Sequence, residues 1–282
     1  MMKILMIGAH QDDNEFRVGG LTQKYVKLGY EVRFLSMCNG CGGHHILTPE
    51  ETVRVRAGES AKVAEFLGIT YDVWDIDDCT LVADLETRRR LIRYIRAFAP
   101  DVIITHRAND YHADHRAVGL LVQDASYILT VPHECPDVPA MEKMPIIMYY
   151  EDSFQNPPFQ MDVVIAVDDV IEGKMKIADI NVSQVYEWLP YTYQETVPED
   201  EEERFKWLCG MDLDRWVSDE EVMQLNRGYA VRSAKTAVRF RKELIEKYGE
   251  EAGSKVRYAE AFSLCPYGRQ PDEELRKQLF DM

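Results

Sequence analysis

The sequence predicts an α/β fold in which a mostly parallel β-sheet has helices packed on both faces. Short apolar runs alternate with segments of helical periodicity through the first half of the chain, which is typical of a doubly wound sheet. The apolar runs are nearly continuous rather than alternating with polar residues, so both faces of the sheet must be covered. We therefore expect a Rossmann-like three-layer sandwich, followed by C-terminal helical and extended segments.

The expected strands of the first half are apolar runs that end at polar or glycine-rich loops. The first covers Met2–Ile7, and the next three cover Glu31–Met37, Asp72–Ile76 and Asp101–Thr105. Between the first two, Gly19–Leu28 has helical periodicity and is followed by Gly29, a common helix terminator. These alternations predict βαβ units and a parallel sheet.

Helix-start signals place the remaining helices of this half. Thr48-Pro49-Glu50-Glu51 combines a threonine cap, proline in the first turn and glutamate at the third position, which predicts a helix as far as Leu67-Gly68. Asp84 is expected to cap a helix that ends at Phe98. A further helix is expected from about Ala113 to Leu129.

The second half of the chain does not continue the regular alternation of strands and helices. Val131–Pro145 contains four prolines and predicts an irregular excursion. The later expected elements are strands over Pro145–Tyr150 and Met161–Val167, helices over Ile171–Tyr186 and Asp219–Tyr248, and an extended segment over Tyr258–Pro266, with the acidic run Pro198–Glu203 linking or capping. We expect one domain over residues 1–282, with residues 1–170 supplying the core sheet and the site and residues 171–282 the closing segments.

Composition excludes several classes of partner. The chain has 33 Lys and Arg against 49 Asp and Glu, a net charge of −16, which disfavours nucleic acid and anionic membrane surfaces. An anionic substrate would need a local basic pocket. The first apolar run is too short for a signal sequence or membrane insertion, and six cysteines in this length do not make a disulfide scaffold. A cytoplasmic location is expected, and a homo-oligomer is left open.

The stretch Ile7–Gly20 places His10, Asp12, Asp13 and Glu15 directly after the first strand. Carboxylates at the end of a buried strand are tolerated mainly where a cation or a reaction needs them. Adjacent Asp12 and Asp13 should point in different directions, so that one can be a ligand and the other a base. The alternative is a polar loop that caps the next helix.

A second cluster, His112-Ala113-Asp114-His115, follows the fourth strand. Because ligands of such sheets bind outside the carboxyl ends of the strands, both clusters should lie at one edge. His10, Asp13 and His115 would form a set of two histidines and one carboxylate with an open position, which suits catalytic zinc, although Fe²⁺ uses the same ligand types. Asp12 would be the general base for metal-bound water and His112 the acid or oxyanion partner.

The segment Cys38-Asn39-Gly40-Cys41-Gly42-Gly43-His44-His45 permits three interpretations. A glycine-rich loop at the active site, with incidental thiols, is favoured over a second metal site because a single CxxC is a weak signal. Redox chemistry is disfavoured because a redox CxxC opens a helix, whereas this one closes a strand. Farther along, Tyr191 and Tyr193 could stack on a sugar ring.

These motifs resemble those of a known family. GAHQDDNE is similar to the AHPDD(x)E signature of the PIG-L/LmbE-like N-acetylglucosaminyl deacetylases, and YHADH resembles their HPDH motif. Further similarities, in order along the chain, are Arg56-x-x-Glu59 with Leu67-Gly68, Pro100–His106 (PDVIITH), Lys174 with Val182-Ser183-Gln184, and Ala259-Glu260-Ala261-Phe262.

The resemblance implies roles for particular residues. It implies His10, Asp13 and His115 as zinc ligands, Asp12 as general base, and His112 as oxyanion stabiliser or acid. Arg56 is the implied substrate-binding arginine, with Arg54 as its rival. Gln11 and Ala113 depart from the family pattern, because each stands where the family has proline.

The expected function is therefore a zinc-dependent hydrolase that removes an acetyl group from an N-acetylated amino sugar or an N-acetylglucosamine conjugate. An alternative is a catalytically silent sugar-binding protein of the same fold. A nucleotide-binding enzyme is disfavoured because neither G-x-G-x-x-G nor G-x-x-x-x-G-K-[ST] follows the first strand. The motifs do not name the rest of the substrate, which we expect to be set by loops such as Val131–Pro145.

Overall fold

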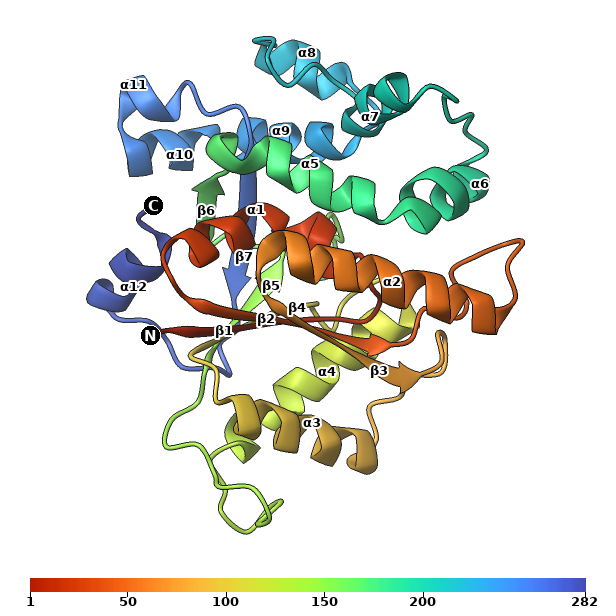
Figure 1. The fold of residues 1–282 in the computed structure, drawn as a ribbon. Coiled ribbons are helices and arrows are strands. Elements are labelled where there is room, and N and C mark those ends of the chain that lie inside the picture. Colours follow the sequence, from red (N-terminus) through yellow and green to blue (C-terminus); the bar gives the residue numbers. More distant parts are fainter.

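The computed structural model describes residues 1–282 and contains one seven-stranded sheet in the order β3-β2-β1-β4-β5-β7-β6 (Figure 1). Its strands are β1 (Lys3–Gly8), β2 (Glu31–Cys38), β3 (Thr70–Ile76), β4 (Val102–Thr105), β5 (Ile146–Tyr150), β6 (Val163–Ala166) and β7 (Ala259–Leu264). The first five strands pair in parallel, and β7 runs antiparallel between β5 and β6. The expected α/β fold with a mostly parallel sheet is confirmed.

Helices cover both faces of this sheet. One face carries α1 (Asp13–Lys27), α2 (Pro49–Leu67) and α5 (Ile171–Ile180), and the other carries α3 (Leu85–Phe98) and α4 (Ala113–Ile128) (Figure 1). The starts of α2 and α3 follow the sequence signals, because Thr48 forms a capping box and Asp84 accepts a hydrogen bond from the Thr87 amide.

Alternation along β1 shows why both faces must be covered. Ile4 and Met6 pack into the core beneath α1 and α2, whereas Leu5 and Ile7 pack into the core against α3 and α4. All four side chains are fully buried. Successive side chains of a strand point to opposite faces, so an apolar run without polar interruptions is what a central strand of a three-layer sandwich requires.

The sheet order defines where a ligand can bind. The chain adds β2 and β3 on one side of β1 and then returns to place β4 on the other side. The strand order therefore reverses between β1 and β4, and the loops after these two strands diverge and leave a crevice at their carboxyl ends. Both polar motifs of the sequence lie in these two loops and in the first turns of the helices that follow them.

Two helices differ from expectation. The first begins at Asp13 rather than Gly19, so Asp13 and Glu15 lie in its first turn, where negative charge is favourable. The expected helix over Ile171–Tyr186 is interrupted at Asn181 and continues as the π-helix η2 (Ser183–Trp188) and α6 (Leu189–Tyr193). Periodicity does not report such local changes of hydrogen-bond register.

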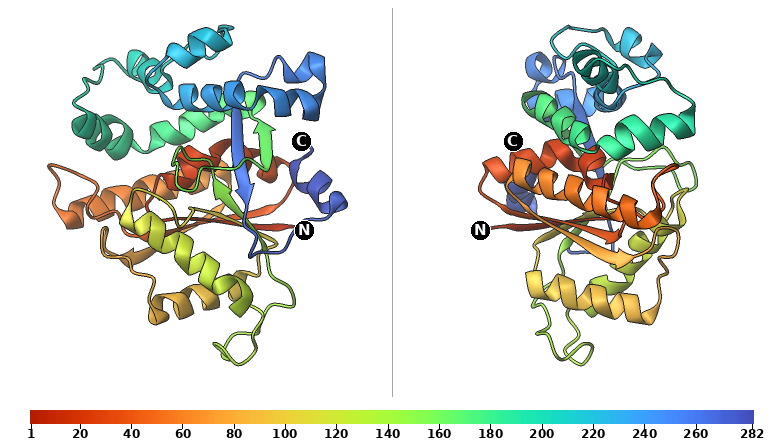
Figure 2. Two further views of the ribbon diagram at one scale, coloured as in Figure 1. Left: turned by 180° about the vertical axis from the view of Figure 1, so that it is seen from behind. Right: turned by 45° about the vertical axis from the view of Figure 1, so that its right-hand side comes forward.

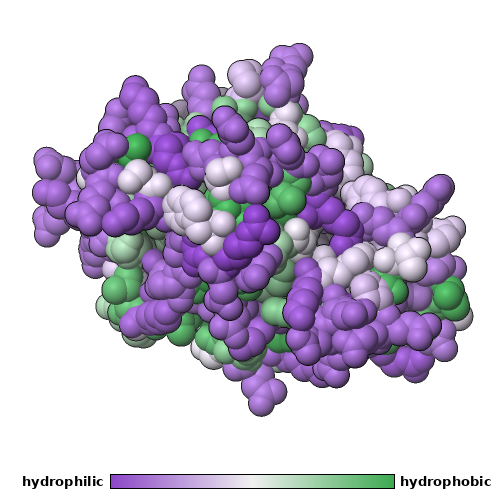
Figure 3. Space-filling view, turned by 90° about the horizontal axis from the view of Figure 1, so that it is seen from above, coloured by the Kyte–Doolittle hydropathy of each residue, from purple (hydrophilic) through white to green (hydrophobic).

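The C-terminal region is more divided than expected, and most of it lies over the face of the sheet that carries α1 and α2 (Figure 2). The expected helix over Asp219–Tyr248 is three helices, separated at Gly228 and Phe240: α8 (Asp219–Gln224), α9 (Tyr229–Arg239) and α10 (Arg241–Tyr248). Helices not expected from the sequence are α7 (Glu201–Cys209), α11 (Glu250–Gly253) and α12 (Glu273–Phe280), with a single 3-10 turn, η1 (Asp168–Val170). The face over these C-terminal helices is mostly hydrophilic, with apolar residues in small separate groups (Figure 3).

A buried ion pair joins the C-terminal region to the core. Lys174 of α5 donates to Glu260 of β7 at 2.6 Å, and both side chains are almost fully buried. Glu260 also accepts hydrogen bonds from the amides of Gly20 and Leu21 in α1. Two motifs that are distant in sequence thus hold α1, α5 and β7 together. No helix in the structure is long and apolar enough to cross a membrane.

Candidate active site

A cavity of about 490 Å³ opens at the carboxyl ends of β1 and β4. Its walls combine histidines and aspartates of the two strand loops with arginines and aromatic side chains of the surrounding helices. The lining residues with polar or aromatic side chains are His10, Asp12, Asp13, Phe16, Arg17, Arg56, Asp78, Cys79, Tyr111, His112, His115, Gln184, Trp188, Tyr193, Tyr229 and Arg232.

Asp13 is held rigidly by the turn after β1. Its Oδ2 accepts hydrogen bonds from the amides of Ala9 and His10 at 3.0 and 2.9 Å and from Nε2 of His106 at 3.1 Å. Burial alone would raise the pKa of Asp13, but His115 and His106 beside it hold that pKa well below its usual range. Because Oδ2 is fully engaged, Oδ1 is the oxygen that faces His115, 3.4 Å from its Nε2.

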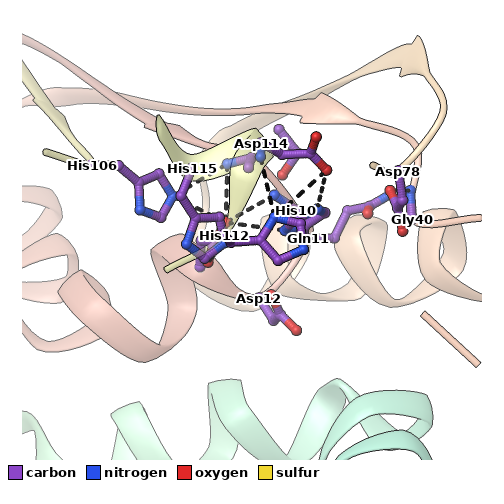
Figure 4. Close-up of polar contacts among 12 residues, drawn as sticks. His10, Gln11, Asp12, Gly40, Asp78, His106, His112, Asp114 and His115 are labelled. Carbon is purple, nitrogen blue, oxygen red and sulfur yellow. Dashed lines mark hydrogen bonds and ion pairs between the residues drawn. The ribbon is translucent and has the colours of Figure 1, made fainter. Parts of the chain in front are cut away.

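His10 and His115 are each held from behind by a carboxylate. Nε2 of His10 lies 3.0 Å from Oδ2 of the fully buried Asp114, and Nδ1 of His115 lies 3.0 Å from Oδ1 of Asp110. The other ring nitrogens, Nδ1 of His10 and Nε2 of His115, face Asp13. Figure 4 shows these rings gathered beside β1 and β4. Metal-ligating histidines almost always have such a partner, which fixes the tautomer and the ring direction.

The pairwise spacing of these atoms is close to the spacing of ligands around a divalent cation. Four ligands about 2.0–2.1 Å from a tetrahedral zinc ion lie about 3.3 Å from one another, whereas His10 Nδ1 lies 3.7 Å from Oδ2 of Asp13 and His115 Nε2 lies 3.4 Å from Oδ1. Two groups of potential ligand atoms lie within 4.8 Å of one another: one is His10, His112 and His115, and the other is Asp13, His106 and His115. The predicted set of His10, Asp13 and His115 is divided between these two groups, which share His115. Burial would lower the pKa of His10, yet Asp114 and the neighbouring aspartates raise it to about 9. The surroundings therefore favour positive charge at this point.

Asp12 lies beside this group with a different set of contacts. Its Oδ2 forms an ion pair with Nη2 of Arg56 at 3.2 Å, and Arg56 also donates to the carbonyl of Gln11. Burial and Asp13 raise the pKa of Asp12 to about 6, and the charge of Arg56 opposes them. Figure 4 shows Asp12 pointing away from the histidine cluster, toward the green helices of the C-terminal half. A carboxylate with a pKa near neutrality is suited to accept and return a proton.

His112 presents a donor to the cavity. It caps α4, and its Nδ1 accepts a hydrogen bond from the amide of Asp114 at 3.2 Å. Burial, together with the charges of His10 and His115, lowers the pKa of His112. The neutral ring must then carry its proton on Nε2, so this nitrogen can donate to a negatively charged oxygen.

Gln11 and the loop Cys38–His45 support each other. The buried Gln11 donates to the carbonyl of Asn39, and a Cβ on Gly40 would lie 2.6 Å from Gln11 Oε1. Gly40 also has a φ of +83°, which suits glycine. Gln11, where the family has proline, thus links the β1 turn to this loop. Asp78 accepts hydrogen bonds from the Gly40 and Gly42 amides and completes the cavity wall.

The thiols and histidines of this loop do not converge on one point. All six cysteines of the chain are free, and Cys38 is buried while Cys41 is partly exposed. His44 pairs with Glu187 at 2.8 Å, and His45 stacks on Tyr191 with ring centroids 3.8 Å apart. The groupings of potential ligand atoms in the chain do not include Cys41 or either histidine. This arrangement agrees with a glycine-rich loop that forms a wall of the site.

The structure brings most of the sequence-predicted site residues together. His10, Asp12, Asp13, His112, His115 and Arg56 all line the cavity, whereas Arg54 is exposed and lies outside it. The motifs Arg56-x-x-Glu59 and Ser183-Gln184 meet, because Ser183 donates to Glu59 through its amide and hydroxyl, both at 2.7 Å. No residue of Val131–Pro145 lines the cavity; this segment leads into the amino end of β5, at the other edge of the sheet.

Sequence reasoning missed two kinds of residue. Asp110, Asp114 and His106 touch the expected ligands, and the rule that ligating histidines need an acceptor behind them could have indicated the two aspartates. Arg17 and Arg232 also line the cavity, but no local motif marks them.

Comparison with known proteins agrees with the geometry of the site. Residues 5–126 match the family model described as PIG-L: GlcNAc-PI de-N-acetylase. This segment therefore matches a PIG-L family domain. It contains most of β1, all of β2 to β4 and every predicted ligand, so the resemblance of the motifs is confirmed.

Proteins similar to this chain include enzymes of two kinds. Over 196 residues the chain is 24% identical to a 4-oxalmesaconate hydratase of Pseudomonas putida, covering 67% of this chain and 76% of the relative. The crystal structure of GalB, the 4-carboxy-2-hydroxymuconate hydratase of Pseudomonas putida KT2440, matches with a TM-score of 0.70 at 18% identity, covering 97% and 99% of the two chains. An N,N'-diacetylchitobiose deacetylase of Pyrococcus horikoshii matches with a TM-score of 0.65 at 21% identity, covering 97% and 88%. The family and these relatives support an enzyme that acts as a deacetylase or a hydratase.

Proposed function

We propose that this protein is a metal-dependent hydrolase that removes an acetyl group from an N-acetylated amino sugar or its conjugate. One observation carries the proposal: His10 and His115 are held from behind by Asp114 and Asp110, so that their free nitrogens face the two carboxylate oxygens of Asp13 at 3.7 and 3.4 Å. A merely structural histidine cluster would not need both rings to be oriented toward one carboxylate.

The ligand set supports zinc, with Fe²⁺ as the other cation that these residue types accept. His10, Asp13 and His115 would hold it and leave one position open. A cation bound there supplies a water of lowered pKa and polarises a carbonyl oxygen.

The chain's own residues would handle the protons. Asp12, whose pKa is raised to about 6, would accept a proton from the attacking water and pass it to the leaving amine. His112 would donate from Nε2 to the oxygen of the acetyl carbonyl as negative charge develops on it, because its Nδ1 already accepts from the Asp114 amide. Arg56 keeps Asp12 in place through their ion pair.

A second candidate reaction is the addition of water to a double bond of an unsaturated acid. The relative that is 24% identical is a hydratase, and the matching GalB structure is described as one. The same groups serve either reaction, because both need an activated water, a base and a group that stabilises negative charge on oxygen.

The test is acetate release from a panel of N-acetylated amino sugars by protein loaded with zinc or Fe²⁺, with and without a chelator. We expect release that the chelator abolishes. Asp12→Asn should lower kcat by about 10²–10⁴-fold while the protein still binds one equivalent of metal. Asp75→Asn is the matched control, since Asp75 is exposed on β3 and pairs only with Arg90.

Two outcomes would contradict the deacetylase proposal. If no member of the panel releases acetate but loss of ultraviolet absorbance shows that an unsaturated carboxylic acid is hydrated, the second candidate is supported instead. If the metal-loaded protein binds N-acetylated sugars without changing them, and Asp12→Asn alters nothing, the chain is a binding protein.

A further inference from the structure

Two arginines from distant parts of the chain meet in the cavity. Arg17 lies on α1, one helical turn after Asp13, and Arg232 lies on α9, one turn after Tyr229. Both line the main cavity with the histidine cluster, and both also line a small pocket of about 20 Å³ behind it. Residues three or four apart share one face of a helix, so each arginine projects from the face that carries another residue of the cavity.

Neither guanidinium is neutralised by an acid. Arg17 donates to the main-chain carbonyl of Glu151 at 2.7 Å, and the side chain of Arg232 forms no hydrogen bond or ion pair. The nearby carboxylate of Glu151 is already engaged by Arg239 at 2.8 Å and by the hydroxyl of Thr236. Arg17 is partly buried and Arg232 is exposed to solvent, and neither guanidinium is occupied by a carboxylate, so both are available to an incoming anion.

The electrostatic environment shows that the two arginines act on each other. The positive charge of Arg17 lowers the pKa of Arg232 to about 10. Repulsion between like charges in a cleft is tolerated where a ligand relieves it. Arginine forks match the planar oxygens of a carboxylate, and also the oxygens of a phosphate, through paired hydrogen bonds.

The rest of this wall is aromatic. Phe16 and Tyr229, the neighbours of the two arginines, lie with ring centroids 4.5 Å apart, and Tyr111 and Tyr193 also line the cavity. A ligand that reaches the arginines from the histidine cluster therefore passes along apolar ring faces. This arrangement fits a molecule with a polar reacting end, a compact body and a charged far end.

We propose that Arg17 and Arg232 form an anion subsite that binds a carboxylate or phosphate group of the substrate, at the end remote from the reacting atoms. This inference rests on the proposed function in one respect, because it takes the histidine cluster as the reacting end. It narrows the substrate class to anionic molecules. The local basic pocket that an acidic chain needs for an anionic substrate is then this pair of arginines.

Calorimetric titration of the zinc-loaded protein tests the subsite with compounds that are not turned over. The probes are straight-chain dicarboxylates from glutarate to suberate, the monocarboxylates of equal length, and the matching ω-phosphonocarboxylates. We expect at least one doubly anionic probe to bind roughly tenfold to a hundredfold more tightly than its monocarboxylate, as hydrogen bonds between charged groups allow. A larger gain for the dicarboxylate indicates a carboxylate substrate, and a larger gain for the phosphonate indicates a phosphate.

Variants show which residues supply the gain in affinity of the doubly anionic probe. Arg232→Gln and Arg17→Gln should each abolish most of it, whereas Arg276→Gln, which removes the same charge from the exposed face of α12, should retain it. Arg232→Gln removes the repulsion between Arg232 and Arg17, so its melting temperature should be no lower than that of the wild type. Lost binding in this variant then cannot be ascribed to misfolding. The subsite is overturned if no doubly anionic probe gains affinity, or if the gain survives both arginine variants. Acetate release does not enter this test, so failure of the deacetylase proposal would be seen separately.

Discussion

Replacing Asp114 by asparagine tests whether the carboxylate behind His10 contributes to metal binding. Oδ2 of Asp114 accepts both of its hydrogen bonds, from His10 Nε2 at 3.0 Å and from the Cys79 amide at 2.7 Å, whereas Oδ1 has no partner. Asparagine can therefore place its oxygen at the Oδ2 position and its amide group at the unpaired position. The substitution removes the negative charge and leaves the hydrogen-bond geometry intact.

The expected loss follows from this geometry. Loss of a partner behind a metal-ligating histidine typically weakens metal binding 10–100-fold, which is about 1.4–2.7 kcal/mol. Asp114 also favours a proton on His10, whose pKa is raised to about 9, and below pH 9 zinc must displace that proton from the wild type. The deficit of Asp114→Asn should therefore be larger at pH 9.5 than at pH 7.

Competition with a chromophoric zinc chelator measures this difference directly. Asp124→Asn is the control, because Asp124 lies on the same helix, is exposed and pairs with Arg88 at 3.1 Å outside the site. Equal zinc affinity in the wild type and Asp114→Asn at both pH values would refute the assignment of His10 as a ligand supported by Asp114. A loss of affinity in Asp124→Asn of the same size would show a general charge effect instead.

Three further changes test the stability of the fold. Lys174→Met leaves Glu260 buried without its partner and should lower the free energy of unfolding in urea by about 3–5 kcal/mol, with partial recovery in the double variant Lys174→Met/Glu260→Gln. Gly40→Ala introduces a Cβ 2.6 Å from the nearest side-chain oxygen at a φ of +83° and should destabilise by about 1–3 kcal/mol, whereas Gly58→Ala, with no atom within 4 Å, should stabilise slightly. Burial lowers the pKa of Lys247 to about 8. Between about pH 8 and 10.5 only the unfolded state therefore keeps the proton of this lysine, so the free energy of unfolding should rise with pH over this range. Lys247→Met should flatten that rise.

Much of the fold could be predicted because its signals are local. The apolar run of β1 and the caps Thr48 and Asp84 each act within a few residues, and all lie where expected. The breaks at Asn181 and Phe240 were not predicted, because each residue is compatible with a helix and the interruption comes from packing against other elements. At such positions the packing of the rest of the protein decides whether a helix continues, because the intrinsic helix propensity of the residue is a weak influence.

The residues of the site likewise include some that local motifs reveal and others that only the packing of distant helices brings into place. His10, Asp13 and His115 are recognisable because two short motifs carry them to strand ends that share an edge. Arg232 gives no such signal: it follows an unpredicted break at Gly228, and it reaches the cavity because α9 packs on β7 and α5. Contacts that depend on how distant helices dock cannot be obtained from periodicity, and the two arginines that we propose as the anion subsite depend on such contacts.

The overall charge of the protein and the local charge of its cavity predict that salt affects anionic substrates and not neutral ones. A net charge of −16 repels an anion at long range, whereas Arg17 and Arg232 attract it only within the cavity that they line. Salt screens interactions between exposed charges beyond about 8 Å at physiological ionic strength, and contacts within a partly enclosed site much less. Raising the ionic strength from low values should therefore increase kcat/KM for an anionic substrate and leave a neutral N-acetylated sugar unaffected. A decrease for the anion would mean that attraction to the cavity already dominates at long range, contrary to the charge distribution described above.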